Sequence, residues 1–138
     1  AVLDDPRRGT AGVFAVAVVV ALAAGASPRS PLDYLAADLY SKALTVAVAG
    51  HSRPFKPGLG ALFIEAARGR WPLAALAFVI AAAYSPAAAA AAATASLFLF
   101  LALYRHLGGA NGDVFGALLE VSRAAYLYAL GRVAFAQS

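Results

Sequence analysis

A run of thirty-four residues, from 71 to 104, carries no charged side chain. This run is longer than one membrane crossing, because a helix of about 20 apolar residues already spans the hydrocarbon core of a bilayer. Pro86 lies near the middle of the run, and proline favours the first turn of a helix. The run therefore predicts a hairpin of two helices, 71–84 and 87–104, with one long kinked helix as the alternative. Seven consecutive alanines at 87–93 predict a closely packed helix face.

The remaining chain is also strongly apolar, with candidate helices at 11–26, 32–50 and 114–135. Hydrophobic residues make up 62% of the sequence and charged residues 13%, whereas soluble domains have about 45–50% and about 25%. We therefore expect an all-α, polytopic membrane helix bundle with about five transmembrane helices, forming a single integral-membrane domain over residues 1–138. The sequence has no cysteine, which excludes disulfides and thiolate metal sites.

The positive charges are distributed unevenly over the ends of these five helices. If the connections alternate between sides, the segments 1–10, 51–70 and 105–112 share one side and hold seven of the eleven Lys and Arg residues. Positive residues collect on the cytoplasmic side of membrane proteins. The pattern predicts a multi-pass protein of the cell membrane whose functional face is cytoplasmic. No nucleic-acid motif is present, so we expect the lipid bilayer, and no nucleic acid, as a partner.

The segment 108–120 places four glycines, an Asn, an Asp and a Glu between two apolar regions. Glycine allows the backbone to approach a ligand closely, and Asn111 is a favoured helix N-cap. Asp113 and Glu120 are seven residues apart and lie near one line of the following helix. The two carboxylates could hold a divalent ion against a phosphate. On spacing alone, a simple turn with an N-cap, and with Glu120 paired to Arg123, is the favoured alternative.

The connection 51–70 is cationic, because it contains four basic residues, Arg53, Lys56, Arg68 and Arg70, and a single acidic residue, Glu65. With glycines at 58 and 60, such a loop suits a phosphate-bearing nucleotide. The alternative is a basic surface loop attracted to anionic lipid. Within 32–50, Asp38 and Lys42 are four residues apart and should face the protein interior. They line a polar cleft or form a structural ion pair, two readings that the sequence does not separate.

Three ordered stretches resemble one family. Leu-Gly-Gly-Ala-Asn-Gly-Asp-Val-Phe-Gly-Ala-Leu-Leu-Glu at 107–120 is similar to the C-terminal signature of cobalamin synthases, the adenosylcobinamide-GDP ribazoletransferases. The stretches 5–12 (Asp-Pro-Arg-Arg-Gly-Thr-Ala-Gly) and 53–63 resemble two further family segments, the latter with Pro-Phe-Lys-Pro as a departure in length. Family members also carry an upstream His/Asp-rich segment that is not found here. The chain is therefore expected to be the C-terminal part of a longer enzyme.

The resemblance implies a magnesium-dependent transferase of a substituted phosphate group. The family transfers adenosylcobinamide phosphate from adenosylcobinamide-GDP to α-ribazole, or to its 5′-phosphate, and releases GMP in the final steps of cobalamin biosynthesis. The implied catalytic residues are Asp113, Arg53 and Arg7. The implied Mg²⁺ ligands are Asp113, Asp5 and Glu120. The implied substrate-binding residues are Gly108, Gly109, Asn111, Gly112, Lys56, Gly58 and Gly60.

Two other functional classes remain open from the sequence. A small transporter-like bundle would use Asp38, Lys42 and Glu120 as a polar path within the membrane. That class predicts charges spread along the depth of several helices, whereas most charges here lie in loops on one side. A non-catalytic membrane subunit is the other alternative.

Overall fold

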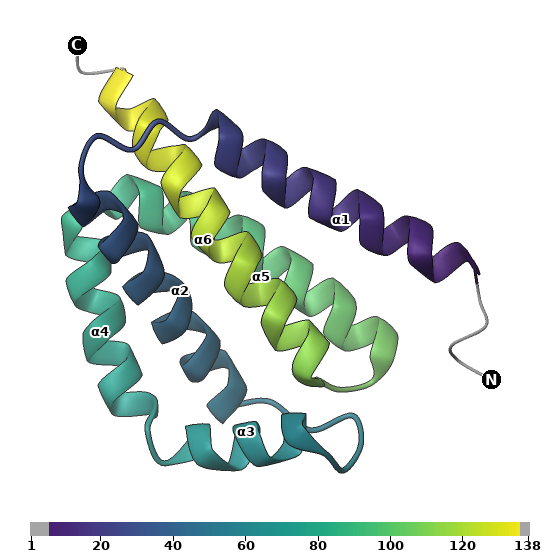
Figure 1. Ribbon diagram of the computed structural model, residues 1–138. Coiled ribbons are helices and arrows are strands. Elements are labelled where there is room, and N and C mark those ends of the chain that lie inside the picture. Colours follow the sequence, from purple (N-terminus) through teal and green to yellow (C-terminus); the bar gives the residue numbers. More distant parts are fainter. Residues whose placement is uncertain (1–5, 136–138) are drawn as a thin grey trace.

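The computed structural model describes residues 6–135, and side chains from Val16 to Val133. This part of the chain is all-helical, which confirms the predicted fold class (Figure 1). The helices are α1 (Pro6–Gly25), α2 (Pro31–Gly50), α3 (Leu59–Arg68), α4 (Trp71–Tyr84), α5 (Pro86–Leu107) and α6 (Gly112–Phe135).

The predicted break at Pro86 is confirmed. α4 ends at Tyr84 and α5 begins at Pro86, with Ser85 as its N-cap; the Ser85 hydroxyl accepts a hydrogen bond from the amide of Ala88 at 3.4 Å. α5 ends at Leu107 and is capped by Gly108, whose φ of 75° lies in the left-handed region that glycine adopts without strain. The uncharged run therefore forms a hairpin of two helices, and the alternative of one long kinked helix is wrong.

Two buried tyrosines hold the centre of the bundle together. The rings of Tyr40 on α2 and Tyr126 on α6 lie 4.9 Å apart between centroids, and both residues are fully buried. The Tyr40 hydroxyl donates to the carbonyl of Ala89 at 2.8 Å, and the Tyr126 hydroxyl donates to the carbonyl of Ala81 at 2.7 Å. These bonds connect α2 with α5 and α6 with α4, so each buried hydroxyl is satisfied.

The alanine run forms the packing face predicted for it. Ala88, Ala89 and Ala92 on α5 are all buried, and α5 packs along α6 while α2 packs against α4 and α6. In Figure 1, α6 crosses the bundle between α5 and α2, and α1 lies beside α6 on the side away from α2. Small side chains allow these helices to approach closely.

α5 is long and apolar enough to cross a membrane. α3 and α4 together would be a second crossing if the 82° bend between them is a break within one span. Among the described residues, then, one or at most two elements have the length and composition of a span, and the predicted five transmembrane helices remain a prediction. Several large apolar side chains on α4 point away from the core, including Leu73, Leu76, Val79 and Ile80.

The structure adds one helix that the sequence analysis did not predict. Residues 51–70 were expected to be a polar connection, but Leu59–Arg68 forms α3. Ile64 and Ala67 are buried on one face of α3, while its charged residues Glu65 and Arg68 are exposed. Ala67 packs closely against α2, since a Cβ added at Gly50 would lie 3.3 Å from the Ala67 carbonyl oxygen. The helix is amphipathic and depends on this packing.

Candidate functional site

The cationic connection between α2 and α3 meets the glycine-rich connection between α5 and α6 at one end of the bundle (Figure 1). The amide of Phe55 donates to the carbonyl of Ala110 at 2.9 Å, and the amide of Ala110 donates to the carbonyl of Arg53 at 2.9 Å. These two bonds form a short parallel bridge between Pro54 and Ala110. The connection that carries Arg53 and Lys56 is thus fixed beside the one that leads to Asp113.

Two of the predicted substrate-binding glycines are packed against the chain itself. A Cβ at Gly109 would lie 2.8 Å from the Cα and N of Phe55, and a Cβ at Gly60 would lie 2.9 Å from the amide nitrogen of Gly112. Both distances are shorter than side chains tolerate. Gly109 lies close to the backbone of Phe55, and Gly60 lies close to the backbone of Gly112. These two glycines therefore allow the segment around 55–60 to pack against the segment 109–112.

The other glycines serve different local needs. Gly58 precedes α3 with φ 147°, and Gly108 follows α5 with φ 75°; both are backbone conformations that other residues rarely adopt. Gly112, at the start of α6, leaves open space where a Cβ would stand. Of the predicted glycines, Gly112 is therefore the one at which the backbone is both helix-initiating and open.

The predicted N-cap at Asn111 is confirmed. Its side-chain oxygen Oδ1 accepts a hydrogen bond from the amide of Val114 at 2.9 Å, which satisfies one of the free amides at the start of α6. Asp113 follows in the first turn of α6 and is exposed. Since the start of α3 lies against the start of α6 through Gly60, two helix N-termini are adjacent here.

Tyr104 is a member of this region that the sequence analysis missed. Its hydroxyl accepts a hydrogen bond from the amide of Arg53 at 3.1 Å, which connects α5 to the cationic connection. No motif contains Tyr104, and it lies in the predicted helix 87–104 as an ordinary aromatic residue. Because α2 and α5 run in the same direction, their C-terminal ends lie together, and this places Tyr104 beside Arg53.

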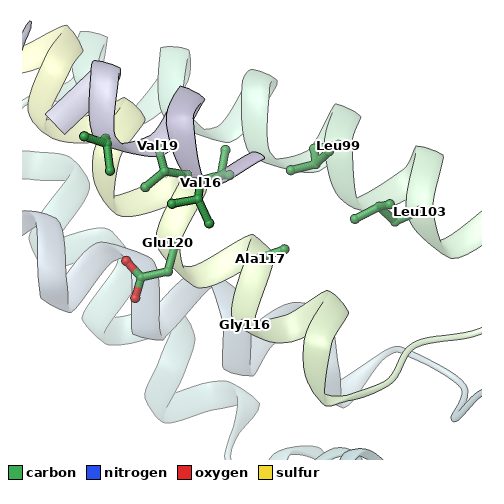
Figure 2. Close-up of a pocket in the computed structure, with 9 residues that line it drawn as sticks. Val16, Val19, Leu99, Leu103, Gly116, Ala117 and Glu120 are labelled. Carbon is green, nitrogen blue, oxygen red and sulfur yellow. The ribbon is translucent and has the colours of Figure 1, made fainter. Parts of the chain in front are cut away.

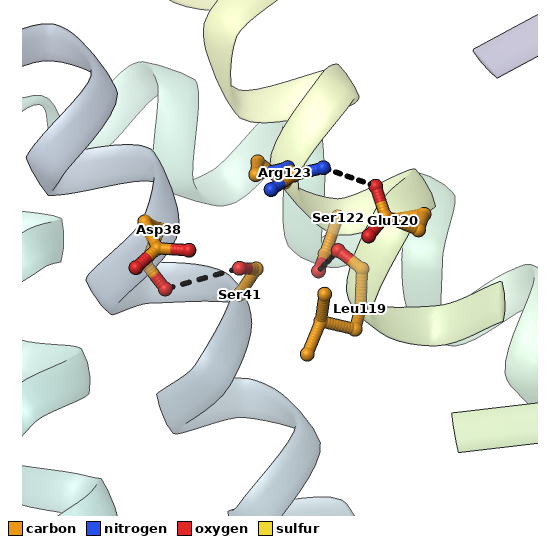
Figure 3. Close-up of polar contacts among 6 residues, drawn as sticks. All are labelled: Asp38, Ser41, Leu119, Glu120, Ser122 and Arg123. Carbon is orange, nitrogen blue, oxygen red and sulfur yellow. Dashed lines mark hydrogen bonds and ion pairs between the residues drawn. The ribbon is translucent and has the colours of Figure 1, made fainter. Parts of the chain in front are cut away.

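Glu120 lies two turns beyond Asp113 and forms an ion pair with Arg123 (Figure 3). The predicted alternative pairing is therefore confirmed. Asp38 and Lys42 also pair, with 2.6 Å between Oδ2 and Nζ. Their predicted interior position is wrong for the described bundle, because the Lys42 side chain is 62% exposed and the Asp38 side chain 37%. The two pairs lie on neighbouring helices, α2 and α6.

A cavity of about 380 Å³ opens directly beside the two helix N-termini. It lies between α3 and α6 and is bordered by glycines and aromatic rings: Gly60, Phe63, Gly112, Phe115 and Gly116. The Phe63 and Phe115 rings lie 5.3 Å apart between centroids. The cavity therefore shares Gly60 and Gly112 with the paired connections.

A second cavity, of about 390 Å³, lies between α1, α5 and α6 (Figure 2). Its walls are apolar and include Val16, Val19, Leu99 and Leu103, and Glu120 is the one ionisable residue among its described lining side chains. In Figure 2 the Glu120 carboxylate points away from Leu99 and Leu103. The carboxylate is thus directed toward Arg123 and away from the apolar walls.

The remaining predicted site residues divide into two groups. Arg53 and Lys56 are exposed beside the paired connections. Asp5 lies outside the described residues, and Arg7 lies in α1 at a position whose side chain is not described. Between residues 16 and 133, no group of three or more His, Cys, Asp or Glu side chains is arranged to hold a metal ion. A metal here would need substrate oxygens as ligands in addition to Asp113.

Comparison with known proteins points in one direction. The family description "Cobalamin-5-phosphate synthase" matches residues 1–131. An adenosylcobinamide-GDP ribazoletransferase of Pyrobaculum islandicum is 59% identical over 126 residues, which is 91% of this chain and 56% of that protein. One from Pyrobaculum calidifontis is 59% identical, covering 92% of this chain and 58% of that protein.

A more distant relative is the enzyme of the same name from Halobacterium salinarum, which is 39% identical over 93% of this chain and 72% of that protein. The chain spans just over half the length of the two Pyrobaculum relatives. No solved structure matches the fold significantly.

Proposed function

Because this chain belongs to the cobalamin-5-phosphate synthase family, we propose that its protein acts as an adenosylcobinamide-GDP ribazoletransferase. In this reaction a hydroxyl oxygen of α-ribazole, or of its 5′-phosphate, attacks the phosphorus that carries the cobinamide. The bond from that phosphorus to the GMP oxygen breaks, GMP leaves, and the proton of the attacking hydroxyl is released. The products are adenosylcobalamin, or its 5′-phosphate, and GMP. The Pyrobaculum and Halobacterium relatives carry the corresponding enzyme name.

The observation that best supports this proposal is the bridge between the two family-like connections. It holds the cationic segment of Arg53 and Lys56 beside the start of α6 at Asp113. A diphosphate needs neutralised oxygens and a fixed orientation more than it needs covalent help from the protein. Two adjacent helix N-termini add the partial positive charge of free backbone amides. The side chains of Arg53 and Lys56 would also contact the phosphate oxygens.

The available donors suit a magnesium ion that is bound mainly through substrate phosphates. Mg²⁺ commonly uses one or two carboxylates together with phosphate oxygens and water, and Asp113 supplies one exposed carboxylate here. When bound, magnesium would neutralise charge on the diphosphate. We place Asp113 ahead of Glu120 as its ligand, because the Glu120 carboxylate is paired with Arg123. Asp5 and Arg7 belong to the same proposal through the family resemblance alone.

We place the protein in the cell membrane as a multi-pass protein with these connections on the cytoplasmic side. The charge asymmetry of the sequence supports this topology, and so does the candidate span α5. Nucleotide substrates occur in the cytoplasm, the compartment that this side would face.

The proposal is tested by an assay of membranes that hold the full-length protein. The membranes are supplied with adenosylcobinamide-GDP, α-ribazole and Mg²⁺, and GMP release is followed. We expect release that depends on both substrates, on the metal and on the protein. GMP release that is independent of α-ribazole would indicate hydrolysis instead of transfer. No GMP release in membranes that contain the folded protein would favour the non-catalytic subunit or the transporter-like bundle.

A further inference from the structure

The geometry points to the cavity between α3 and α6 as the site for the base of the ribazole acceptor, an inference that rests on the proposed function. The cavity begins where the candidate diphosphate-binding connections end, because Gly60 and Gly112 border both. A nucleoside bound with its base in the cavity would place its sugar toward the exposed start of α6 and Asp113. The acceptor hydroxyl and the diphosphate would then approach each other from adjoining sites.

The walls of the cavity fit a flat aromatic ring. Phe63 on α3 and Phe115 on α6 border it with their rings 5.3 Å apart between centroids and inclined at 57°. Phe63 is 38% exposed, so one ring of the pair is accessible from outside the bundle. Aromatic side chains bind bases through stacking that needs no hydrogen bonds. The volume of about 380 Å³ lies in the range of small-molecule sites.

The glycines leave this wall open. Gly112 and Gly116 are four residues apart on α6 and therefore lie on the same face of the helix. A Cβ added at either position meets no other atom within 4 Å. The packing of the bundle itself therefore gives no reason for the missing side chains at these positions. A ligand lying against this face would explain why both positions lack a side chain.

The lining also distinguishes between the aromatic groups of the two substrates. Among the described lining side chains, Thr45 is the polar one, and its hydroxyl already donates to the carbonyl of Ser41 at 2.8 Å. Guanine carries several donors and acceptors around its edge, and burying these without partners is costly. The dimethyl-substituted benzimidazole of ribazole carries one free ring nitrogen and two methyl groups. The corrin ring system is much too large for the cavity. The benzimidazole is the group that matches.

The test compares Michaelis constants for the two substrates in membranes that hold the full-length protein. Phe63→Ala removes one aromatic wall, and Gly116→Leu fills the space. We expect each to raise the KM for α-ribazole by about tenfold or more, while the KM for adenosylcobinamide-GDP changes by less than about twofold. Ala117→Leu is the matched control, because Gly116 borders both this cavity and the cavity beside α1, whereas Ala117 borders the cavity beside α1 and is absent from the lining of this one. It should leave both constants unchanged.

The outcomes separate this inference from the proposed function. If the wild-type protein releases no GMP in response to α-ribazole, the proposed function fails. If the wild type is active but Phe63→Ala and Gly116→Leu leave the KM for α-ribazole unchanged, or raise both constants in proportion, the cavity is not the base site. The conservative Phe63→Tyr keeps the aromatic ring and should retain the wild-type KM. Equal impairment of Phe63→Tyr and Phe63→Ala would also overturn the inference.

Discussion

The amide of Phe55 donates a hydrogen bond to the carbonyl of Ala110 at 2.9 Å, although the two residues belong to connections far apart in the sequence. Ala110 returns a bond of the same length from its own amide to the carbonyl of Arg53. Reciprocal backbone bonds of this kind fix the distance and the register of the two segments. The candidate site therefore depends on backbone contacts as much as on its charged side chains.

Replacing Gly109 with alanine should disrupt this contact. The added Cβ would lie 2.8 Å from backbone atoms of Phe55, which have no free end to move away. We expect a loss of stability of about 1–3 kcal/mol, the usual cost of overpacking, together with reduced GMP release. Thermal unfolding in detergent measures the first effect. The matched control is Gly69→Ala, since a Cβ at Gly69 meets nothing within 4 Å. Equal effects of the two substitutions would contradict this reading.

Replacing Asn111 with alanine removes the N-cap of α6. The amide of Val114 would lose the side-chain acceptor that now lies 2.9 Å away, and caps of this kind contribute about 1 kcal/mol. The same unfolding measurement should detect the loss. Asn111→Asp and Asn111→Ser keep an acceptor at the same position and should recover most of the stability. A variant series in which alanine is no worse than serine would argue against a capping role.

The sequence was sufficient to predict the features that depend on local chemistry. Pro86 marks the start of α5, and Asn111 caps α6 as expected. α3 was missed because the basic residues, prolines and glycines of 51–70 indicated a polar loop, although seven of the ten residues of α3 are apolar. Only Ile64 and Ala67 of α3 are buried against the bundle. The bridge between Pro54 and Ala110 was also missed, as was the hydrogen bond from the Arg53 amide to the Tyr104 hydroxyl. Such contacts join distant residues and follow from the packing of whole helices, which no local pattern contains.

Arg53 and Lys56 should determine the affinity for the diphosphate substrate if the proposed function holds. Removing one charged contact to phosphate costs about 1.5–3 kcal/mol, which is roughly a tenfold to hundredfold rise in KM. We therefore expect Arg53→Ala and Lys56→Ala to raise the KM for adenosylcobinamide-GDP and to weaken its dependence on salt concentration. Arg68→Ala is the control, because Arg68 lies at the far end of α3. A similar rise for Arg68→Ala would indicate a general effect of positive charge.

The proposed topology can be tested by labelling, because these 138 residues contain no cysteine. Ser27, Arg68 and His106 are exposed and lie at the two ends of the bundle, Ser27 at one end and the other two at the opposite end. In intact cells we expect a membrane-impermeant thiol reagent to modify Ser27→Cys only. Arg68→Cys and His106→Cys should react after permeabilisation. Modification of all three in intact cells would refute the cytoplasmic position of the candidate site.

The two carboxylates on α6, Asp113 and Glu120, have different surroundings. Asp113 is exposed in the first turn, whereas Glu120 is paired with Arg123 two turns further along. Seven residues of helix span about 10.5 Å along the axis, so one ion coordinated at about 2.1 Å would have difficulty reaching both side chains. We expect Asp113→Asn to raise the Mg²⁺ concentration needed for half-maximal GMP release by tenfold or more, a change of about 1.4 kcal/mol in binding free energy.

Glu120→Gln is the internal comparison for Asp113→Asn, because both substitutions replace a carboxylate with an amide on the same helix. The ion pair between Glu120 and Arg123 is partly exposed, and such pairs contribute about 0–1 kcal/mol to stability. We therefore expect a small change in unfolding temperature and an unchanged Mg²⁺ requirement. If instead Glu120→Gln raises the Mg²⁺ requirement as much as Asp113→Asn, then Glu120 exchanges Arg123 for the metal when substrate binds. The family-based assignment of both carboxylates as ligands would then hold, and the pairing of Glu120 with Arg123 would describe only the protein without substrate.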